Sequence, residues 1–356
     1  MCGGWFGFDF SEEILTMRRY EALTSELSGD SHPGAVLCRD FTLRTDKGRV
    51  SLRRGTPLQE ALEQMPDDAG DSTLHFLAPD PDDITQEDAS ERIAMAIVGD
   101  GLHPTEPHQG QVDLRAAAAG VLRIDSAAVE RLNEPRLALI ATALDGRVVE
   151  PDETVAIVKA SELLVSSVDI EALLQTVGEY PVVQVAPFTR QRVALIAGDR
   201  IREQNLNVSS KHLAAGLERY GADLADVRKI EDDPDTIAST YRELLESGID
   251  LILVAGSIVL DPEDPYLQAL DRIDAELVRR GAPIDPGTMF WVARADDVHI
   301  FGLASCEMYG KLSIIDLFLP YALADQTIDN ALISRLGYGG LLNDTHVVRR
   351  PASWRE

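Results

Sequence analysis

The spacing of apolar residues divides the chain into two regions of different character. From Val182 onward, short runs that are apolar throughout alternate with segments in which apolar residues recur every three or four positions. A continuous apolar run is typical of a strand buried on both faces, and the second pattern is typical of a helix with one face on a core. The alternation predicts an α/β fold with three layers, in which helices cover both faces of a doubly wound, mostly parallel sheet.

Individual segments make this prediction specific. Strands are expected at 192–198 and 249–256, and the segment 289–303 is expected to form two strands around an Asp-Asp turn. Helices are expected at 208–221, 235–248, 266–281 and 310–324. Gly221 and Gly248 provide stop signals for the first two helices, and Pro320 is expected to kink or end the last one.

Before Val182 the pattern is mixed. Residues 1–33 are predicted to be an irregular or weakly helical lead-in, residues 34–110 a mixed α+β region, and residues 111–181 a small, mostly β module. The α/β domain then occupies residues 182–345. Within the mixed region, Thr85 is expected to cap a helix with Asp88 three residues on.

Composition narrows the classes of partner. The chain has 356 residues and 33 Lys and Arg against 60 Asp and Glu, a formal charge of −27. Such a charge disfavours nucleic acid and anionic membranes, so a phosphate-bearing ligand would have to be held locally by backbone amides. Three cysteines without a CxxC pair argue against a zinc or disulfide framework and fit a reducing cytoplasm. No apolar run approaches the length of a membrane span, and no secretory signal is evident.

Three predicted strand ends are candidates for a ligand site. They are Gly198-Asp199, Gly256-Ser257 and the stretch from Gly302 to Ser305. Ligands of doubly wound sheets bind beyond the carboxyl ends of the strands, where glycine lets the backbone come close. A glycine after a strand is also the usual residue of a tight turn, so one such turn alone has little weight; three on one edge predict a concave rim.

Other polar residues leave more than one interpretation open. Asp261 and Asp264 are suited to hold Mg²⁺ beside a nucleotide or oxyanion, but an acidic turn in solvent explains them equally well. Lys311 is a candidate phosphate contact or an exposed helix lysine. His103, Glu106 and His108 carry metal-binding groups, although nothing else in the sequence completes a site. Common nucleophile and nucleotide motifs are missing from the sequence.

Taken in order, several motifs resemble the molybdopterin-binding domain of molybdopterin molybdotransferases and adenylyltransferases. They are "GDRI" at 198–201, "DLILVAGS" at 250–257, Asp264, "GAPIDPG" at 281–287 and "GLAS" at 302–305. The chain after about residue 33 is also similar to stand-alone bacterial molybdopterin-binding proteins. Ser257 stands where the family has a second glycine, and Ala304-Ser305-Cys306 replaces a Pro-Gly-Asn turn. These departures bear on catalysis more than on binding.

The resemblance implies a pocket for the pterin phosphate, with Asp264 nearest the chemistry. The lining residues would be Gly198, Asp199, Gly256, Ser257, Asp264, Gly287, Gly302 and Ser305, with Lys311 as the added phosphate contact. If the protein is an enzyme, the implied reaction is adenylyl transfer to the pterin or molybdate insertion, with Asp261 and Asp264 as catalytic residues and Mg²⁺ ligands.

We therefore expect a cytoplasmic protein that binds molybdopterin or a related pterin phosphate in the making or delivery of the molybdenum cofactor. Self-association and contact with a molybdoenzyme or a cofactor-biosynthesis protein are further expectations. The alternative is a non-catalytic binding or regulatory protein for another small ligand. A third, weaker hypothesis is a pyrophosphate hydrolase.

Overall fold

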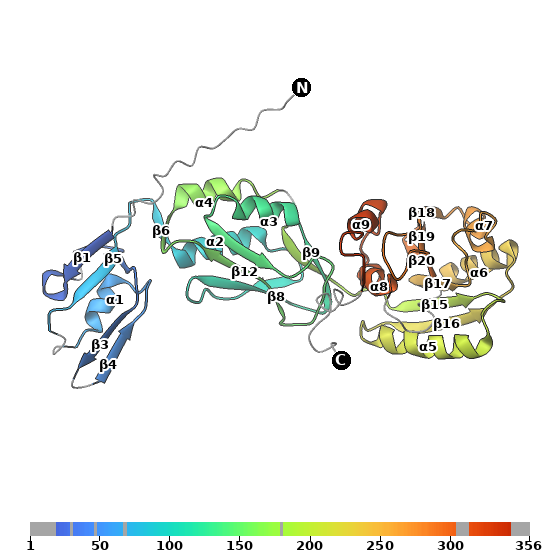
Figure 1. Cartoon of the computed structure of the whole chain (residues 1–356), viewed down its shortest axis with the longest axis horizontal. Helices are drawn as coiled ribbons and strands as arrows, with labels where there is room; N and C mark the ends of the chain where they lie inside the picture. Colours follow the sequence, from blue (N-terminus) through green and yellow to red (C-terminus); the bar gives the residue numbers. More distant parts are fainter. Residues whose placement is uncertain are drawn as a thin grey trace, which may run out of the picture.

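A computed structural model describes residues 19–28, 31–45, 48–66, 70–178, 181–303 and 313–342 of the chain. Three bodies follow one another in chain order along the longest axis (Figure 1). We call them the N-terminal, middle and C-terminal bodies, and they correspond to residues 19–77, 83–187 and 192–342. Within the described ranges, no helix is both long and apolar enough to cross a membrane.

The N-terminal body is a small α+β unit. Its three-stranded antiparallel sheet has the order β1-β5-β2, and β3 and β4 form a separate hairpin. Leu52, Leu58, Leu74 and Phe76 are among the residues of its core. The elements are β1 (Arg19–Leu23), the 3-10 turn η2 (Thr24–Glu26), β2 (Val36–Leu37), β3 (Phe41–Thr45), β4 (Gly48–Leu52), α1 (Leu58–Glu63) and β5 (Thr73–Leu77).

The expectation of an irregular or weakly helical start is wrong for Arg19–Leu23. This segment is strand β1, and it pairs along its whole length with β5, from Arg19 opposite Leu77 to Leu23 opposite Thr73. Its own residues give no strand alternation. Pairing with a strand 50 to 58 positions further along the chain supplies the hydrogen bonds that hold this segment extended.

The middle body is built from antiparallel sheets and three helices. Its largest sheet has the order β10-β12-β8-β7, and a second has the order β11-β9-β14. The elements are β6 (Asp83–Thr85), α2 (Gln86–Ile97), β7 (Leu102–Pro104), β8 (Gln111–Ala116), β9 (Gly120–Ile124), α3 (Ser126–Asn133), β10 (Ala138–Thr142), β11 (Val148–Val149), β12 (Thr154–Ala160), β13 (Leu164–Ser166), α4 (Ser167–Leu174) and β14 (Val183–Pro187).

Helix α2 begins as the sequence predicts. The Thr85 hydroxyl oxygen accepts a hydrogen bond from the Asp88 amide at 3.1 Å, and the hydroxyl donates to the Asp88 carboxylate at 2.8 Å. The buried side chains of Ala89, Ile93 and Ala94 belong to the same core as those of β8 and β12. Strand β7 pairs with β8. Helix α2 and strand β7 therefore belong to the same body as the strands that begin at residue 111. The predicted boundary at residue 110 divides this body.

The C-terminal body is the predicted three-layer α/β fold. Its six-stranded sheet has the order β16-β15-β17-β20-β19-β18; neighbouring strands pair in parallel from β16 to β20, and the pairs β20–β19 and β19–β18 are antiparallel. The strands are β15 (Arg192–Ala197), β16 (Asp223–Lys229), β17 (Leu251–Ala255), β18 (Glu276–Arg280), β19 (Trp291–Ala295) and β20 (Val298–Leu303). The helices are α5 (Glu203–Glu218), α6 (Pro234–Glu246), α7 (Pro265–Asp271), α8 (Ile315–Leu323) and α9 (Asn330–Arg335).

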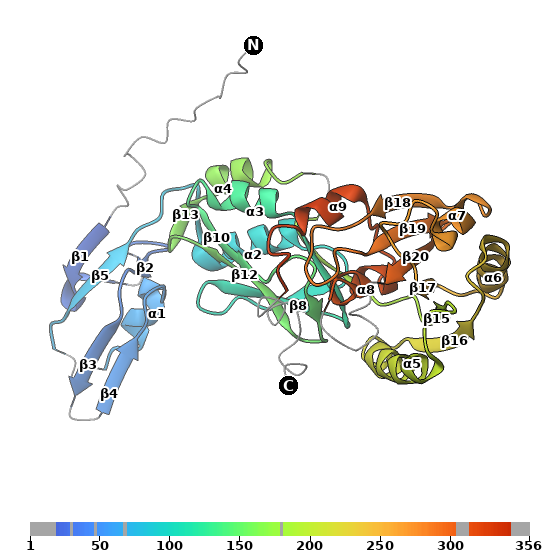
Figure 2. The same ribbon diagram turned by 45° about the vertical axis from the view of Figure 1, so that its right-hand side comes forward.

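Alternate residues of the central strands pack into two hydrophobic cores, one on each face of the sheet. Leu195 and Leu253 pack with α5, α8 and α9, whereas Ile196 and Val254 pack with α6 and α7. Strand β17 is fully buried over all five residues, which is why its sequence is apolar throughout. Figures 1 and 2 show α5 and the α6–α7 pair on different sides of this sheet.

Three sequence predictions for this body differ from the structure. The helix expected at 266–281 is the short α7 followed by strand β18, which hydrogen-bonds to β19 at the sheet edge. Strand β16 was not predicted. It is an edge strand with many polar residues, and its pairing with β15 gives it the extended conformation. Helix α8 includes Pro320 and runs on to Leu323, so the proline does not end it at that point.

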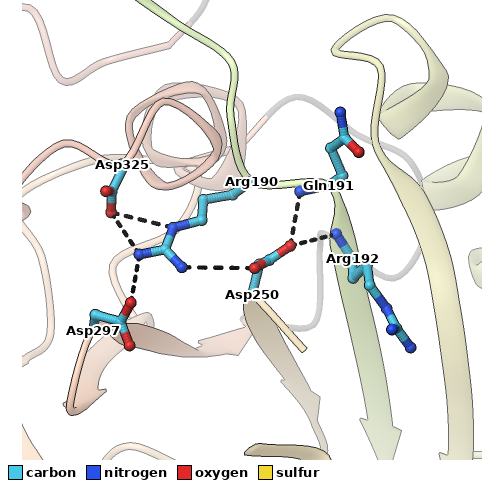
Figure 3. A network of polar contacts seen from close by, with 6 residues as sticks. All are labelled: Arg190, Gln191, Arg192, Asp250, Asp297 and Asp325. Carbon is cyan, nitrogen blue, oxygen red and sulfur yellow. Dashed lines mark hydrogen bonds and ion pairs between the residues drawn. The ribbon is translucent and has the colours of Figure 1, made fainter. Parts of the chain in front are cut away.

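The connection from β14 into β15 is tied down by Arg190, whose side chain is 19% exposed. The guanidinium contacts carboxylates of Asp250, Asp297 and Asp325 (Figure 3). Asp250 in turn accepts hydrogen bonds from the backbone amides of Gln191 and Arg192 at 2.9 and 2.8 Å. This cluster fastens the first strand of the C-terminal sheet at the end opposite the candidate site.

Candidate functional site

The carboxyl ends of the parallel strands lie side by side at one edge of the C-terminal sheet. Ala197, the last residue of β15, is in register with Ala255 at the end of β17, and Ala255 is in register with Leu303 at the end of β20. The Gly198 amide donates to the Ala255 carbonyl at 3.1 Å. The turns at Gly198 and Gly256 are therefore neighbours, as expected for two parts of one rim.

Glycine is required at both turns, for different reasons. Gly256 has φ +114°, a backbone conformation that side chains with a Cβ rarely adopt. At Gly198 the obstacle is space, since an added Cβ would overlap the Asp232 carboxylate and the Tyr266 hydroxyl. The positive φ falls on Gly256, and Ser257 is not among the residues with positive φ. Replacement of the family's second glycine by serine is thus compatible with this turn.

Ser257 is held by two hydrogen bonds within the protein. Its hydroxyl donates to Asp264 Oδ1 at 3.1 Å and accepts from the indole nitrogen of Trp291 at 2.8 Å. Trp291 is completely buried. The Ser257 side chain therefore connects the end of β17 to the start of β19 and is directed at the protein.

Asp264 is 2% exposed and is the N-cap of helix α7. Its Oδ1 accepts from the amides of Tyr266 and Leu267 at 3.0 and 3.1 Å, as well as from Ser257. Its Oδ2 accepts from the Ile258 amide at 2.6 Å. These four donors stabilise the carboxylate in its buried position and fix the loop after β17.

Asp261 and Asp264 differ in how far their carboxylate oxygens are already hydrogen-bonded within the protein. The Asp261 carboxylate accepts from the Glu263 amide at 2.9 Å, and both oxygens of Asp264 are already bonded to protein donors. Mg²⁺ needs several free oxygen ligands in near-octahedral geometry. In the described parts of the chain, no three His, Cys, Asp or Glu residues come together to hold a metal, and this includes His103, Glu106 and His108.

The edge also contains residues that the sequence did not indicate. The Tyr266 hydroxyl donates to Asp232 Oδ1 at 2.9 Å, directly beside Gly198. Burial, followed by the hydrogen bond to Asp232, raises the pKa of Tyr266. Arg200 lies 3.9 Å from the other oxygen of Asp232. Asp232 follows strand β16 closely, so recognising that strand would have placed this residue at the same edge.

The remaining predicted residues have separate positions. Gly302 lies within β20 opposite Trp291, where any Cβ would overlap the indole ring. Gly287, with φ +127°, lies in the connection between β18 and β19, which reaches the same sheet edge and packs on Ile314. Asp199 is exposed next to Gly198. Ser305 and Lys311 fall outside the described residues. The structure thus brings together Gly198, Asp199, Gly256, Ser257 and Asp264.

The strand order of the sheet defines a doubly wound α/β domain. Its candidate site lies beyond the carboxyl ends of the parallel strands. Residues 193–324 match the family model described as "Probable molybdopterin binding domain". The resemblance predicted from the sequence is thus confirmed for this part of the chain. The matched residues cover most of the C-terminal body, and the predicted likeness of the front half remains a prediction. A comparison with curated protein sequences found no match.

Three similar solved structures each cover 37–38% of this chain. A Mog protein of molybdopterin biosynthesis from Mycobacterium ulcerans is 13% identical, with 38% of this chain and 97% of that chain covered and a TM-score of 0.28. The molybdopterin biosynthesis enzyme MoaB from Thermus thermophilus is 18% identical, with 38% and 94% covered and a TM-score of 0.27. A CinA protein of unknown function from Thermoplasma acidophilum is 14% identical, with 37% and 98% covered and a TM-score of 0.31.

Proposed function

We propose that the C-terminal body binds molybdopterin or a related pterin phosphate, as part of molybdenum cofactor biosynthesis or delivery in the cytoplasm. The family match over residues 193–324 is the observation that carries this proposal. The glycine turns at 198 and 256 support it, because they lie side by side at the edge of the sheet where such folds bind a ligand.

The start of helix α5 is the best place for the phosphate. The 16-residue helix begins directly after the turn at Gly198, and no side chain caps its first turn in the described structure. Uncapped amides at a helix start attract an anion. The start of α7, by contrast, already has the Asp264 carboxylate on its amides. Arg202, the N-cap residue of α5, is exposed beside the acidic Glu203 of the first turn, and it is the cation that we propose contacts the phosphate.

The test is retention of pterin by the full-length protein. The chain is expressed in a host that makes molybdopterin, purified, denatured and oxidised, and the released fluorescent pterin is measured. Wild type is expected to retain nearly one pterin per chain. Arg202→Glu should reduce the retained pterin about tenfold, the loss expected for one charge-assisted phosphate contact. Lys211→Glu makes the same charge change midway along α5 and should leave retention unchanged.

A folded wild-type protein without pterin, beside a known binder that retains it, would overturn this proposal and leave the alternative of another small ligand. Equal losses in Arg202→Glu and Lys211→Glu would place the pterin elsewhere. Self-association, also proposed from the resemblance, is tested by sedimentation of the same preparation.

A catalytic activity, either adenylyl transfer to the pterin or molybdate insertion, is a separate and more specific proposal. Its test is release of AMP from an adenylylated pterin with and without Mg²⁺. A Mg²⁺-dependent release that Asp261→Asn reduces would support catalysis at the acidic loop. Bound pterin without AMP release would support a non-catalytic binder, which the saturated hydrogen bonding of Asp264 favours.

A further inference from the structure

A large cavity lies between the N-terminal and middle bodies, far along the chain from the candidate pterin site. Its volume is about 1280 Å³. The N-terminal body contributes the loop after β2 and the turn after β4; the middle body contributes the start of α2, the turn before β8, and β12. Figure 2 shows β2 and α1 on the side of the N-terminal body that faces the middle one.

The charge of the cavity is opposite to that of the chain. Four cationic side chains line it, Arg39, Arg53, Arg54 and Lys159, against the two carboxylates of Asp40 and Glu87. The whole chain, by contrast, has a formal charge of −27. In so acidic a protein, a local excess of cations facing one cavity is the pattern expected of an anion site.

Three arginines of this cavity are not paired with a carboxylate in the described structure, whereas several arginines of the other two bodies are. Six arginines in the middle and C-terminal bodies make close contacts with carboxylates, namely Arg123, Arg147, Arg190, Arg228, Arg272 and Arg294. Among the described residues, no ion pair involves Arg39, Arg53 or Arg54. Their guanidinium groups are exposed and available to a ligand.

Asp40 and Lys159 have structural partners that keep the arrangement in place. Asp40 accepts a hydrogen bond from the Arg54 amide at 2.9 Å, which ties the two N-terminal segments together. Lys159 donates to the Gln109 carbonyl at 2.7 Å, so its ammonium is held at the cavity wall. Val36, Leu77 and Leu164 form a small apolar cluster that joins the two bodies beside the cavity.

We propose that this cavity binds a phosphate-bearing small molecule of about nucleotide size. The guanidinium fork matches the geometry of phosphate oxygens, and cations contributed by both bodies would converge on one anionic group. The volume is at or above the usual range of about 300–1,000 Å³ for small-molecule sites, so it has room for a nucleotide. The site is distinct from the pterin edge and does not depend on the function proposed above.

The experiment is calorimetric titration of the full-length protein with inorganic pyrophosphate and with ATP. Wild type is expected to bind both, and the affinity should fall as salt is added because the contacts are ionic. The double substitution Arg53→Glu/Arg54→Glu should weaken binding of each probe by about tenfold or more, since two charge-assisted contacts become repulsive. Lys159→Gln, from the other body, should weaken binding by a smaller factor.

The matched control is Arg44→Glu/Arg49→Glu, which makes the same charge change on the β3–β4 hairpin outside the cavity lining. It should change affinity less than twofold, and circular dichroism should show all variants folded. Arg39→Gln gives a milder test if the double variant does not fold. Failure of wild type to bind either probe at millimolar concentration would overturn the proposal. Equal weakening of binding by Arg53→Glu/Arg54→Glu and by the control double variant would also overturn it. Tighter binding of a glutamate-rich peptide, lost in Arg53→Glu/Arg54→Glu, would replace the small molecule with a protein partner.

Discussion

Arg190 and Asp325 are joined by two hydrogen bonds across 135 positions of the chain. Arg190 Nε and Nη2 lie 3.2 and 2.9 Å from Asp325 Oδ1, and Nη2 also reaches Asp297 at 2.7 Å (Figure 3). Arg190 in this way holds the pKa of Asp297 below its usual value. One side chain thus connects the entry to β15 with the β19–β20 turn and the end of α8.

Arg190→Met is expected to lower the free energy of unfolding by about 2 kcal/mol, because hydrogen bonds to charged groups contribute about 1.5–3 kcal/mol and two of the acceptors are half exposed or more. Urea denaturation measures the change. Arg294→Met is the control, because that arginine makes one contact, to Glu276 at 3.0 Å on the surface, and should cost less than about 1 kcal/mol. Equal losses in both variants would contradict the role assigned to the Arg190 cluster.

Asp264→Ala should destabilise the fold by about 3 kcal/mol, because it leaves several buried donors without an acceptor and removes the cap of α7. Asp261→Ala removes a single local hydrogen bond and should cost less than about 1 kcal/mol. The comparison is made by thermal and urea unfolding. If Asp264→Ala is as stable as wild type, the carboxylate is free for another role, and the catalytic expectation gains support.

Ser257→Gly should lower stability by about 1–2 kcal/mol, because the buried Trp291 indole loses its acceptor. Retention of pterin should be unchanged, since the hydroxyl is directed at Asp264 and Trp291. Pterin retention and urea unfolding are measured on the same samples. A gain in pterin retention would instead identify the serine as an obstacle to the ligand.

His299 should make stability depend on pH. Burial lowers its pKa to about 4, below the usual value near 6.5 in an unfolded chain. Below about pH 6.5, His299 is protonated in the unfolded state but stays neutral in the folded state. Stability therefore falls as the pH drops from 6.5 toward 4. Between pH 7.5 and 5 the loss from this group should be about 1–2 kcal/mol.

The measurement is urea unfolding of wild type and His299→Phe at pH 7.5, 6 and 5. The variant should lose less stability than wild type over this range. His103→Gln, which changes an exposed histidine, should behave like wild type. Parallel pH profiles for wild type and His299→Phe would rule out this titration as the cause.

Some of the architecture could be predicted because it depends on local pattern. Strands β15 and β17 are buried on both faces, so nearly every residue is apolar, and helices α5 and α6 have one apolar side and end near Gly221 and Gly248. The neighbouring turns at Gly198 and Gly256 followed from the same pattern, since parallel strands end at one edge of a sheet.

Other features depend on residues that only the fold brings together. Strand β16 and the segment Glu276–Arg280 are sheet edges, so their conformation is set by the partner strand and not by their own polar patterns. The sequence could suggest chemistry for Asp264, but its four donors come from both sides of the loop and appear only when that loop is folded.

By itself, the sequence determined the α/β class of the C-terminal body and the sheet edge at which the turns of Gly198 and Gly256 lie, because burial on two faces and glycine at strand ends are visible as local sequence patterns. The tertiary structure decided the environment of each side chain at that edge. It also decided the cationic cavity, since Arg39, Arg53, Arg54 and Lys159 are separated in sequence by up to 120 positions and meet only when two bodies pack together. Charge at a distance along the chain has no local pattern, and for that reason no periodicity or motif predicts it.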